Sequence, residues 1–384
     1  MNVTKRFLRD EELAVYLQQL DIKLEKVDDN YRAEALILHQ NDPEKGYPKL
    51  IKNMQIYSQV AVTELIVKTI PVHVMLNKTR QPSLVSSSFG ENTDTIKKTC
   101  ELCKLDRRQR GIIIKVGNEQ EFIILTNPGI TYPGDLTIAA LKHEKQLITG
   151  RFNDMIQISR ALYHFSIYFN GILAGASSSH FHFQAGYKDK LIGEIQIQKL
   201  LAGQSVGQAH LKKLLKSVAL EVFYIENFLR PVHIVVTKNA EALLKFFDHY
   251  LILLKDVSQN IKGIKNVPDY GSLIPALGIR ENEPRLNIML KYFPEYGGFI
   301  LALFPKRYNR PSCYFREGNH QILIGMGIKE ALGNIITGRE TDYKRLRNNP
   351  ALISQIYTET SISSESVEIL NQNLKKINIL PRNR

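Results

Sequence analysis

The sequence predicts an α+β fold, in which an antiparallel sheet with a flanking helix presents polar side chains at a cleft. Short apolar runs bounded by turn residues are typical of strands, and the first set of them lies at 122–126, 136–141, 166–170 and 180–185. Between the second and third runs, residues 152–163 place apolar side chains at the spacing of one buried helical face. We therefore expect at least one helix packed against this set of strands.

A second set of elements follows in a similar order, which predicts a diverged internal duplication with a degenerate second half. Its expected strands lie at 233–237, 286–292, 299–304 and 321–326, with a helix at 240–254. Four segments follow from this organisation: an N-terminal α/β extension (1–95), a catalytic half (96–190), a second half (191–337) and a C-terminal helical tail (338–384). Within them we also expect a helix at 10–20, extended segments at 31–39 and 61–76, a polar loop at 81–95 and a helical stretch at 194–229.

Composition places the chain among ordinary folded proteins and sets limits on its ligands. Of 384 residues, 43% are hydrophobic and 23% charged, which excludes a disordered chain. The net charge of +13 attracts anions, but no block of five consecutive basic residues occurs, so a small phosphate ligand is favoured at least as much as a nucleic acid. Neither a signal peptide nor an apolar stretch of membrane-spanning length is present, and we expect a cytoplasmic protein without a membrane partner.

The clearest chemical motif is His180-Phe181-His182-Phe183-Gln184. Successive side chains of a strand point to opposite faces, so the two histidines and Gln184 share one face while the phenylalanines share the other. On its own the pattern also fits an ordinary half-exposed strand. A neutral imidazole is, however, a competent nucleophile toward phosphorus, and this strand directly follows a loop of small residues, 171–179, whose backbone can approach a phosphate closely.

A second motif, Cys100-Glu101-Leu102-Cys103, has the spacing that lets two thiolates bind one zinc ion. His143 and His180 follow at the ends of predicted elements, so a structural zinc site with two cysteine and two histidine ligands is expected. The alternatives are a redox pair or two structural cysteines. The long gaps between the ligands must be closed by the fold rather than by a local turn.

The run 175–184 resembles the Gly-x-Ser-x-x-His-x-His-x-Gln signature of the histidine-triad superfamily, since the glycine, the serine, both histidines and the glutamine agree in spacing. The similarity is to the branch that contains galactose-1-phosphate uridylyltransferase, diadenosine tetraphosphate phosphorylase and GDP-sugar phosphorylases, and most of all to an uncharacterised bacterial group in it. It covers residues 100–186 well, the second half only around 305–311, and residues 1–95 hardly at all. The fold it implies is a HIT-like antiparallel sheet with flanking helices.

The resemblance also implies roles for individual residues. His182 would be the nucleophile that carries the nucleotidyl group, Gln184 would bind the non-bridging phosphate oxygens, and Ser177 would hold the distal phosphate. Apart from the resemblance, we expect the backbone amides of the loop, those of Ser178 and Ser179 included, to bind substrate phosphates. Asn170 would contact the α-phosphate and Asn127 the ribose, although Asn127 also fits a plain turn. Cys100, Cys103, His143 and His180 match a structural zinc site found in several members.

Two further features bear on the reaction. Glutamine at position 184 is typical of the transferases and phosphorylases of the superfamily, whereas hydrolases carry a third histidine there, and an amide does not readily shuttle a proton to activate water. Lys306 and Arg310 follow an apolar strand and would suit phosphate binding, with a solvated strand end as the alternative.

These observations predict a nucleotidyltransferase or phosphorylase that acts on a nucleoside diphosphate sugar or a dinucleoside polyphosphate through a nucleotidyl-histidine on His182. Inorganic phosphate or a sugar phosphate would be the acceptor. The alternatives are a hydrolase of nucleotide conjugates and a non-catalytic nucleotide- or RNA-binding protein, the latter suggested only by the net charge. Relatives commonly form homodimers, while the residues themselves leave the oligomeric state, the base and the sugar open.

Overall fold

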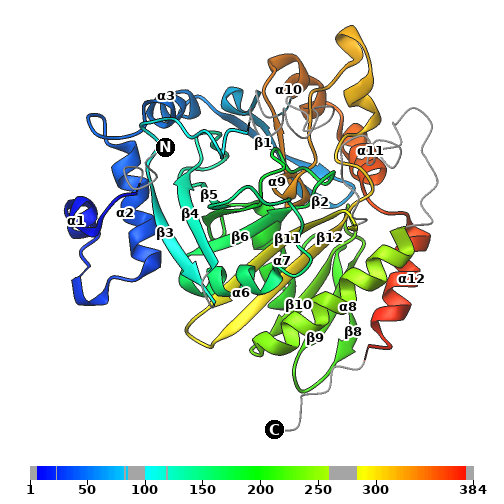
Figure 1. Ribbon diagram of the computed structural model, residues 1–384. Coiled ribbons are helices and arrows are strands. Elements are labelled where there is room, and N and C mark those ends of the chain that lie inside the picture. Colours follow the sequence, from blue (N-terminus) through cyan, green and yellow to red (C-terminus); the bar gives the residue numbers. More distant parts are fainter. Residues whose placement is uncertain are drawn as a thin grey trace.

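The structure is a computed structural model, and one antiparallel sheet of ten strands lies at its centre (Figure 1). The structure describes residues 7–22, 24–81, 84, 100–117, 120–258 and 283–377, so most of the predicted loop 81–95 lies outside the described residues. In chain order the strands are β3 (Gly111–Val116), β4 (Gln120–Thr126), β5 (Leu136–Ala140), β6 (Phe165–Asn170), β7 (His182–Tyr187), β8 (His210–Lys216), β9 (Glu221–Glu226), β10 (His233–Thr237), β11 (Leu286–Phe293) and β12 (Gly298–Pro305). Helices pack on this sheet, so the predicted α+β class is confirmed.

The sheet is built from two halves with the same topology. Its spatial order is β3-β4-β5-β7-β6-β11-β12-β10-β9-β8, so five strands of each half follow the order first, second, third, fifth, fourth. In both halves one helix connects the third strand to the fourth. The fourth strands, β6 and β11, pair with each other, with Tyr168 opposite Met289 at the centre of the pairing. This arrangement is the degenerate duplication that the element order predicts, although the four segment boundaries stay a prediction.

The strand register identifies the residues of the second half that stand at the positions of His182 and Gln184. In the first half, Leu136 at the start of β5 pairs with Ala185; in the second, His233 at the start of β10 pairs with Leu303. The pairing of β6 with β7 and of β11 with β12 gives the same alignment of the two halves. Ile300 and Ala302 therefore occupy the positions of His182 and Gln184. The second half keeps the sheet but not the polar groups.

One face of the sheet carries a helical layer that fixes β7 from behind. The helices α6 (Phe152–Ala161) and α8 (Ala240–Ser258) lie across this face, where Phe152 stacks on Phe247 with ring centroids 3.8 Å apart (Figure 1). Phe181 and Phe183 belong to the same core cluster and are fully buried. The helices α1 (Asp10–Gln19), α2 (Asp29–Asn41) and α12 (Ser364–Leu374) extend this layer. In the described part of the chain, no helix combines the length and apolar character that crossing a membrane requires.

The opposite face, toward which His182 and Gln184 point, is covered mainly by the C-terminal part of the chain. A small sheet of β1 (Ala61–Val67), β2 (Ile70–Leu76) and β13 (Asn334–Thr337) lies on this side, with β2 between the other two strands. The helices around it are α7 (Ile192–Leu201), α9 (Ile328–Ala331), α10 (Glu340–Arg347) and α11 (Pro350–Thr360). Tyr168, Met289 and Ala302 join the core cluster of this side. The predicted polar face is therefore enclosed between two layers.

Three predicted elements are wrong. Residues 31–39 form part of α2, because the Asp28 carboxylate caps the helix by accepting a hydrogen bond from the backbone N–H of Tyr31 (3.2 Å). The helical stretch expected at 194–229 ends with α7 at Leu201 and continues as β8 and β9. Residues 321–326 are extended but form no ladder; the backbone N–H of Ile322 instead donates to the carbonyl of Cys313 (2.9 Å). The helix at 10–20, the extended segment at 61–76 and the helical tail are confirmed.

A buried ion cluster joins the two halves and α7 on the enclosed side. The ammonium of Lys291, on β11, contacts the carboxylates of Glu194 (2.9 Å) and Asp189 (2.5 Å), and the Lys291 and Glu194 side chains are 1% and 0% exposed. Glu194 also accepts hydrogen bonds from Ser166 and Tyr168 of β6. Since a buried charge is tolerated only with its partners, this cluster ties α7 to the centre of the sheet.

We expect Lys291→Met to lower the free energy of unfolding by about 3–5 kcal/mol, because it leaves the Glu194 carboxylate buried without a counter-charge. Denaturant unfolding measures the loss. The double variant Lys291→Met with Glu194→Leu should be less destabilised than the single one. Lys212→Met, at an exposed pair with Glu226, is the matched control and should change stability far less; an equal loss in both single variants would contradict the argument.

Candidate active site around His182

The first residue of β7, His182, is buried on the enclosed face with 4% exposure. Strand alternation sends its neighbours Phe181 and Phe183 into the opposite core, where both are fully buried. The two phenylalanine rings lie 5.0 Å apart and anchor the strand from behind. The orientation of His182 therefore follows from the apolar residues on either side of it.

Hydrogen bonds fix which ring nitrogen of His182 is free. The Nδ1–H of His182 donates to the backbone carbonyl of His180 (2.8 Å), so the Nε2 atom carries the lone pair. Burial lowers the pKa of His182 to about 4; the hydrogen bond that His182 donates to the His180 carbonyl opposes this, and the charge of the His180 ring adds to it. At neutral pH the side chain is thus an uncharged imidazole whose Nε2 has the lone pair that a nucleophile needs.

Gln146 hydrogen-bonds the backbone of His182, a role that no pattern in the sequence indicates. This residue is fully buried in the segment between β5 and α6. Its Oε1 accepts from the backbone N–H of His182 (2.7 Å), and its Nε2 donates to the carbonyls of His182 and Asn170 (3.0 Å each). One side chain therefore connects the start of β7 to the end of β6.

Asn170 and Gln184 extend the polar face beyond His182. Tyr168 of β6 pairs with Gln184 of β7, and the same register continued by two residues sets Asn170 opposite His182. The Nδ2 atom of Asn170 lies 3.5 Å from the Oε1 atom of Gln184. Asn170 is 8% exposed, and Gln184 is half-buried. The two predicted phosphate-binding amides are thus brought together beside His182.

The small-residue loop before β7 leaves unbonded amides near this face. Gly175 has φ +111°, and a side chain at this position would meet the Cα atom of Gly327 at 2.6 Å, so only glycine fits. Among the described residues, the backbone N–H groups of Ser177, Ser178 and Ser179 donate no hydrogen bond. Ser177 is exposed, whereas the Ser178 hydroxyl accepts from the backbone N–H of His180 (3.1 Å). Three free amides in succession suit an anion.

The four predicted metal ligands converge on one point. The sulfur atoms of Cys100 and Cys103, with one ring nitrogen each from His143 and His180, all lie within 4.8 Å of one another. The Nδ1 atom of His180 is 3.7 Å from the Cys100 sulfur and 3.4 Å from the Cys103 sulfur. The His180 Nε2–H donates to the carbonyl of Ala140 (2.7 Å), which leaves Nδ1 as the ligand atom. The cluster could bind a metal ion in the two-cysteine, two-histidine manner.

Both thiols have shifted pKa values in this cluster. Burial raises the pKa of Cys100, but hydrogen bonds from His180 and Cys103 outweigh it and lower the value to about 7. Burial and the neighbouring Cys100 raise the pKa of Cys103 to about 11. One thiolate beside one thiol is the arrangement that two close cysteines adopt before an ion binds, since a metal requires both sulfurs to be deprotonated.

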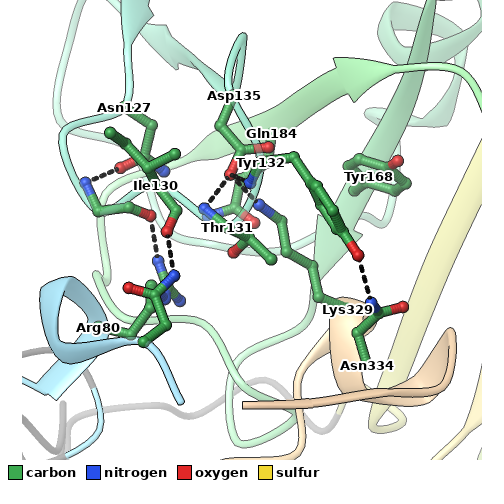
Figure 2. A network of polar contacts seen from close by, with 12 residues as sticks. Arg80, Asn127, Ile130, Thr131, Tyr132, Asp135, Tyr168, Gln184, Lys329 and Asn334 are labelled. Carbon is green, nitrogen blue, oxygen red and sulfur yellow. Dashed lines mark hydrogen bonds and ion pairs between the residues drawn. The ribbon is translucent and has the colours of Figure 1, made fainter. Parts of the chain in front are cut away.

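A polar network, which no pattern in the sequence indicates, connects α9 to the face that carries His182. The ammonium of Lys329 contacts the carboxylate of Asp135, which also accepts from the backbone N–H groups of Thr131 (2.6 Å) and Tyr132 (3.3 Å). Figure 2 shows Lys329 reaching from α9 to Asp135, while Tyr132 extends to Asn334. Asp135 also lies against Gly186 of β7. The C-terminal segment is thus held directly above β7.

Comparisons with known proteins found one family model and solved structures of low sequence identity. A family model described as a domain of unknown function (DUF4922) matches residues 39–187. The chain is similar to the crystal structure of yeast Ap4A phosphorylase Apa2 in complex with Ap4A, with TM-score 0.49 and 10% identity, over 82% of this chain and 96% of that one. The complex of the same enzyme with AMP gives TM-score 0.46 and 11% identity over the same shares. No match was found among curated proteins.

The remaining predicted substrate-binding residues, Asn127, Lys306 and Arg310, make local contacts of their own. The Asn127 Oδ1 accepts from the backbone N–H of Gly129 (2.9 Å), which is the geometry of a turn residue (Figure 2). Lys306 is 4% exposed; burial lowers its pKa to about 7, although the carboxylate of Glu330 acts in the opposite direction. Arg310 donates to the carbonyl of Ile324 (2.8 Å) and lies 4.4 Å from the centre of the Tyr314 ring. Substrate binding by these three residues stays a prediction.

The cluster generates a direct prediction about metal content. We expect the purified chain to hold about one metal ion, and Cys103→Ser to hold almost none, because one of four ligands is lost. Elemental analysis measures the ion, and thermal unfolding should show a lower midpoint in the variant. Cys313→Ser is the matched control, since Cys313 is buried outside the cluster. Equal metal content in the two variants would contradict the assignment.

Proposed function

We propose that the protein is a nucleotidyltransferase of the phosphorylase type, which moves a nucleoside monophosphate group from a nucleoside diphosphate sugar or a dinucleoside polyphosphate by way of a covalent intermediate on His182. The observation that carries the proposal is the hydrogen bond from His182 Nδ1–H to the carbonyl of His180, which leaves Nε2 as the nucleophile. The match of residues 175–184 to the histidine-triad signature supports the same role. Assignment to one group within that superfamily stays part of the proposal.

In the first step, Nε2 of His182 attacks the α-phosphorus and forms a P–N bond. The bond from phosphorus to the bridging oxygen breaks, and the leaving group takes the electron pair: a sugar phosphate from a nucleoside diphosphate sugar, or a nucleoside polyphosphate from a dinucleoside polyphosphate. The imidazole gains positive charge, which the carbonyl of His180 stabilises through the Nδ1–H group that it already binds. The unbonded amides of Ser177, Ser178 and Ser179 would hold phosphate oxygens while charge builds up on them.

In the second step, an oxygen of inorganic phosphate or of a sugar phosphate attacks phosphorus, the P–N bond breaks, and His182 returns to its neutral form. Gln184 favours such an acceptor over water. Its amide can donate to a non-bridging oxygen, but it does not easily remove a proton, and a water molecule must lose one to act as the nucleophile. A phosphate oxygen that is already ionised needs no such base.

The metal bound by the cysteine and histidine cluster would be zinc. Two sulfur and two nitrogen ligands around a closed position are the common donor set of structural zinc, and the separations of the four atoms fit it. Bound zinc would supply structural rigidity rather than a reactive centre. Cys100, Cys103, His143 and His180 would then fix the chain at His180, whose carbonyl orients His182.

We expect His182→Ala to abolish the nucleotidyl adduct and to lower turnover by about 10⁴-fold or more, because no other group replaces the nucleophile. Intact mass spectrometry after incubation with a panel of nucleoside diphosphate sugars and dinucleoside polyphosphates detects the adduct and identifies the base from its mass. His249→Ala is the matched control, since His249 is an exposed residue of α8 that hydrogen-bonds only within its helix. An adduct that persists in His182→Ala would sink the mechanism.

The acceptor can be tested on the isolated adduct. We expect inorganic phosphate to discharge it faster than buffer alone by at least about tenfold, because Gln184 does not activate water. Time-resolved intact mass spectrometry, with and without phosphate, measures both rates. Equal rates would support the hydrolase alternative and contradict the transferase assignment.

A further inference from the structure

Asn287 of β11 is a polar residue of the second half that lies on the face around His182. Its neighbours Leu286, Ile288 and Met289 are apolar, and all four residues are buried. Asn287 pairs with Asn170 across the junction of the two halves. Its side chain therefore brings the second half into direct contact with Asn170.

Two acceptors fix the amide of Asn287. Its Nδ2 atom donates to the Oδ1 atom of Asn170 and to the backbone carbonyl of Ala174, both at 2.6 Å. The backbone carbonyl of Ala174 can only accept a hydrogen bond, so the NH₂ group of Asn287, and not its oxygen, must face these two atoms. The Asn287 Oδ1 is buried and, in the described part of the chain, has no hydrogen-bond partner. An unsatisfied buried oxygen destabilises the fold, so a purely structural role explains this asparagine poorly.

Asn170 is oriented in the same manner. Its Oδ1 accepts from Asn287 and also from the backbone N–H of Ile328 (2.7 Å). Because a backbone N–H can only donate, the Oδ1 atom must face Ile328. The Nδ2 group of Asn170 must consequently point away, toward the Oε1 atom of Gln184 at 3.5 Å. Gln184 in turn is left with its own NH₂ group directed outward. Asn287 thus fixes Asn170, and Asn170 fixes Gln184, so that the NH₂ groups of Asn170 and Gln184 are the ones directed along the strands beside His182.

We propose that Asn287 is a positioning residue, which sets the donor direction of Asn170 and Gln184 toward the phosphate that reacts with His182. This inference rests on the proposed function. Wrongly oriented, either amide would turn a carbonyl oxygen toward a phosphate oxygen and repel it. The second half, which lacks a nucleophile, contributes to the site through this residue.

The test uses the full-length protein and measures the rate of adduct formation in a single turnover at saturating donor. Asn287→Leu should slow this rate about 10- to 100-fold, as expected when a reacting group is misplaced by about 1 Å. The donor concentration at half-maximal rate should change less than the rate itself. Asn371→Leu is the matched control, because Asn371 is a buried asparagine of α12, on the opposite face of the sheet, whose side chain hydrogen-bonds His233.

A double variant separates positioning from general damage. If Asn287 acts through Asn170, the variant with Asn170→Ala and Asn287→Leu should form the adduct no more slowly than Asn170→Ala alone. Multiplicative losses, or an Asn371→Leu variant as slow as Asn287→Leu, would overturn the inference and leave the proposed function standing. A wild-type protein that forms no adduct with any donor would overturn the proposed function, and this inference with it.

Discussion

The hydrogen bond between His182 Nδ1–H and the carbonyl of His180 is the contact on which the rest of the site depends. The two residues are separated by one buried phenylalanine, so the bond lies within a single strand-like turn of the chain. His180 is also one of the four converging cysteine and histidine residues, and its second ring nitrogen donates to Ala140. The ring of His180 is therefore anchored on one side while its carbonyl orients the ring of His182 on the other. A disturbance of the cysteine cluster should reach the catalytic face through this one residue.

The ten-stranded sheet explains why a half without catalytic groups is still needed. Ile300 and Ala302 stand at the positions of His182 and Gln184, so the second half has the architecture without the chemistry. It nevertheless pairs with β6 along the centre of the sheet and provides Lys291 and Asn287, whose side chains bind groups of the first half. The enclosed face also needs its cover: Ile328 of α9 bonds Asn170, and Lys329 bonds Asp135. The site is thus built by segments more than one hundred residues apart.

Much of the catalytic face could be predicted from sequence because its signals are local. Strand alternation sorts His180, His182 and Gln184 from their phenylalanine neighbours, and a two-residue gap marks the cysteine pair. The element order also indicated the duplicated α+β architecture.

The sequence did not reveal the residues whose roles depend on tertiary contacts. Gln146 lies in an irregular segment with no periodicity, and its role comes only from the approach of two strands. Asn287 is a polar residue within an apolar strand, and this pattern indicates only weakly that the residue has a special role. Residues 210–226 were predicted as helix, because their spacing of apolar side chains does not distinguish a helix from two short strands joined by a turn.

The tautomer of His182 tests the account most directly, since the free Nε2 lone pair defines the nucleophile. Nitrogen-15 NMR of protein labelled at histidine, with His182→Ala for assignment, reports the protonation of each ring nitrogen at neutral pH. The account predicts a neutral His182 ring with the proton on Nδ1 and a bare Nε2. A proton on Nε2, in either the neutral or the charged ring, would contradict it, because the atom proposed to attack phosphorus would then have no lone pair to donate.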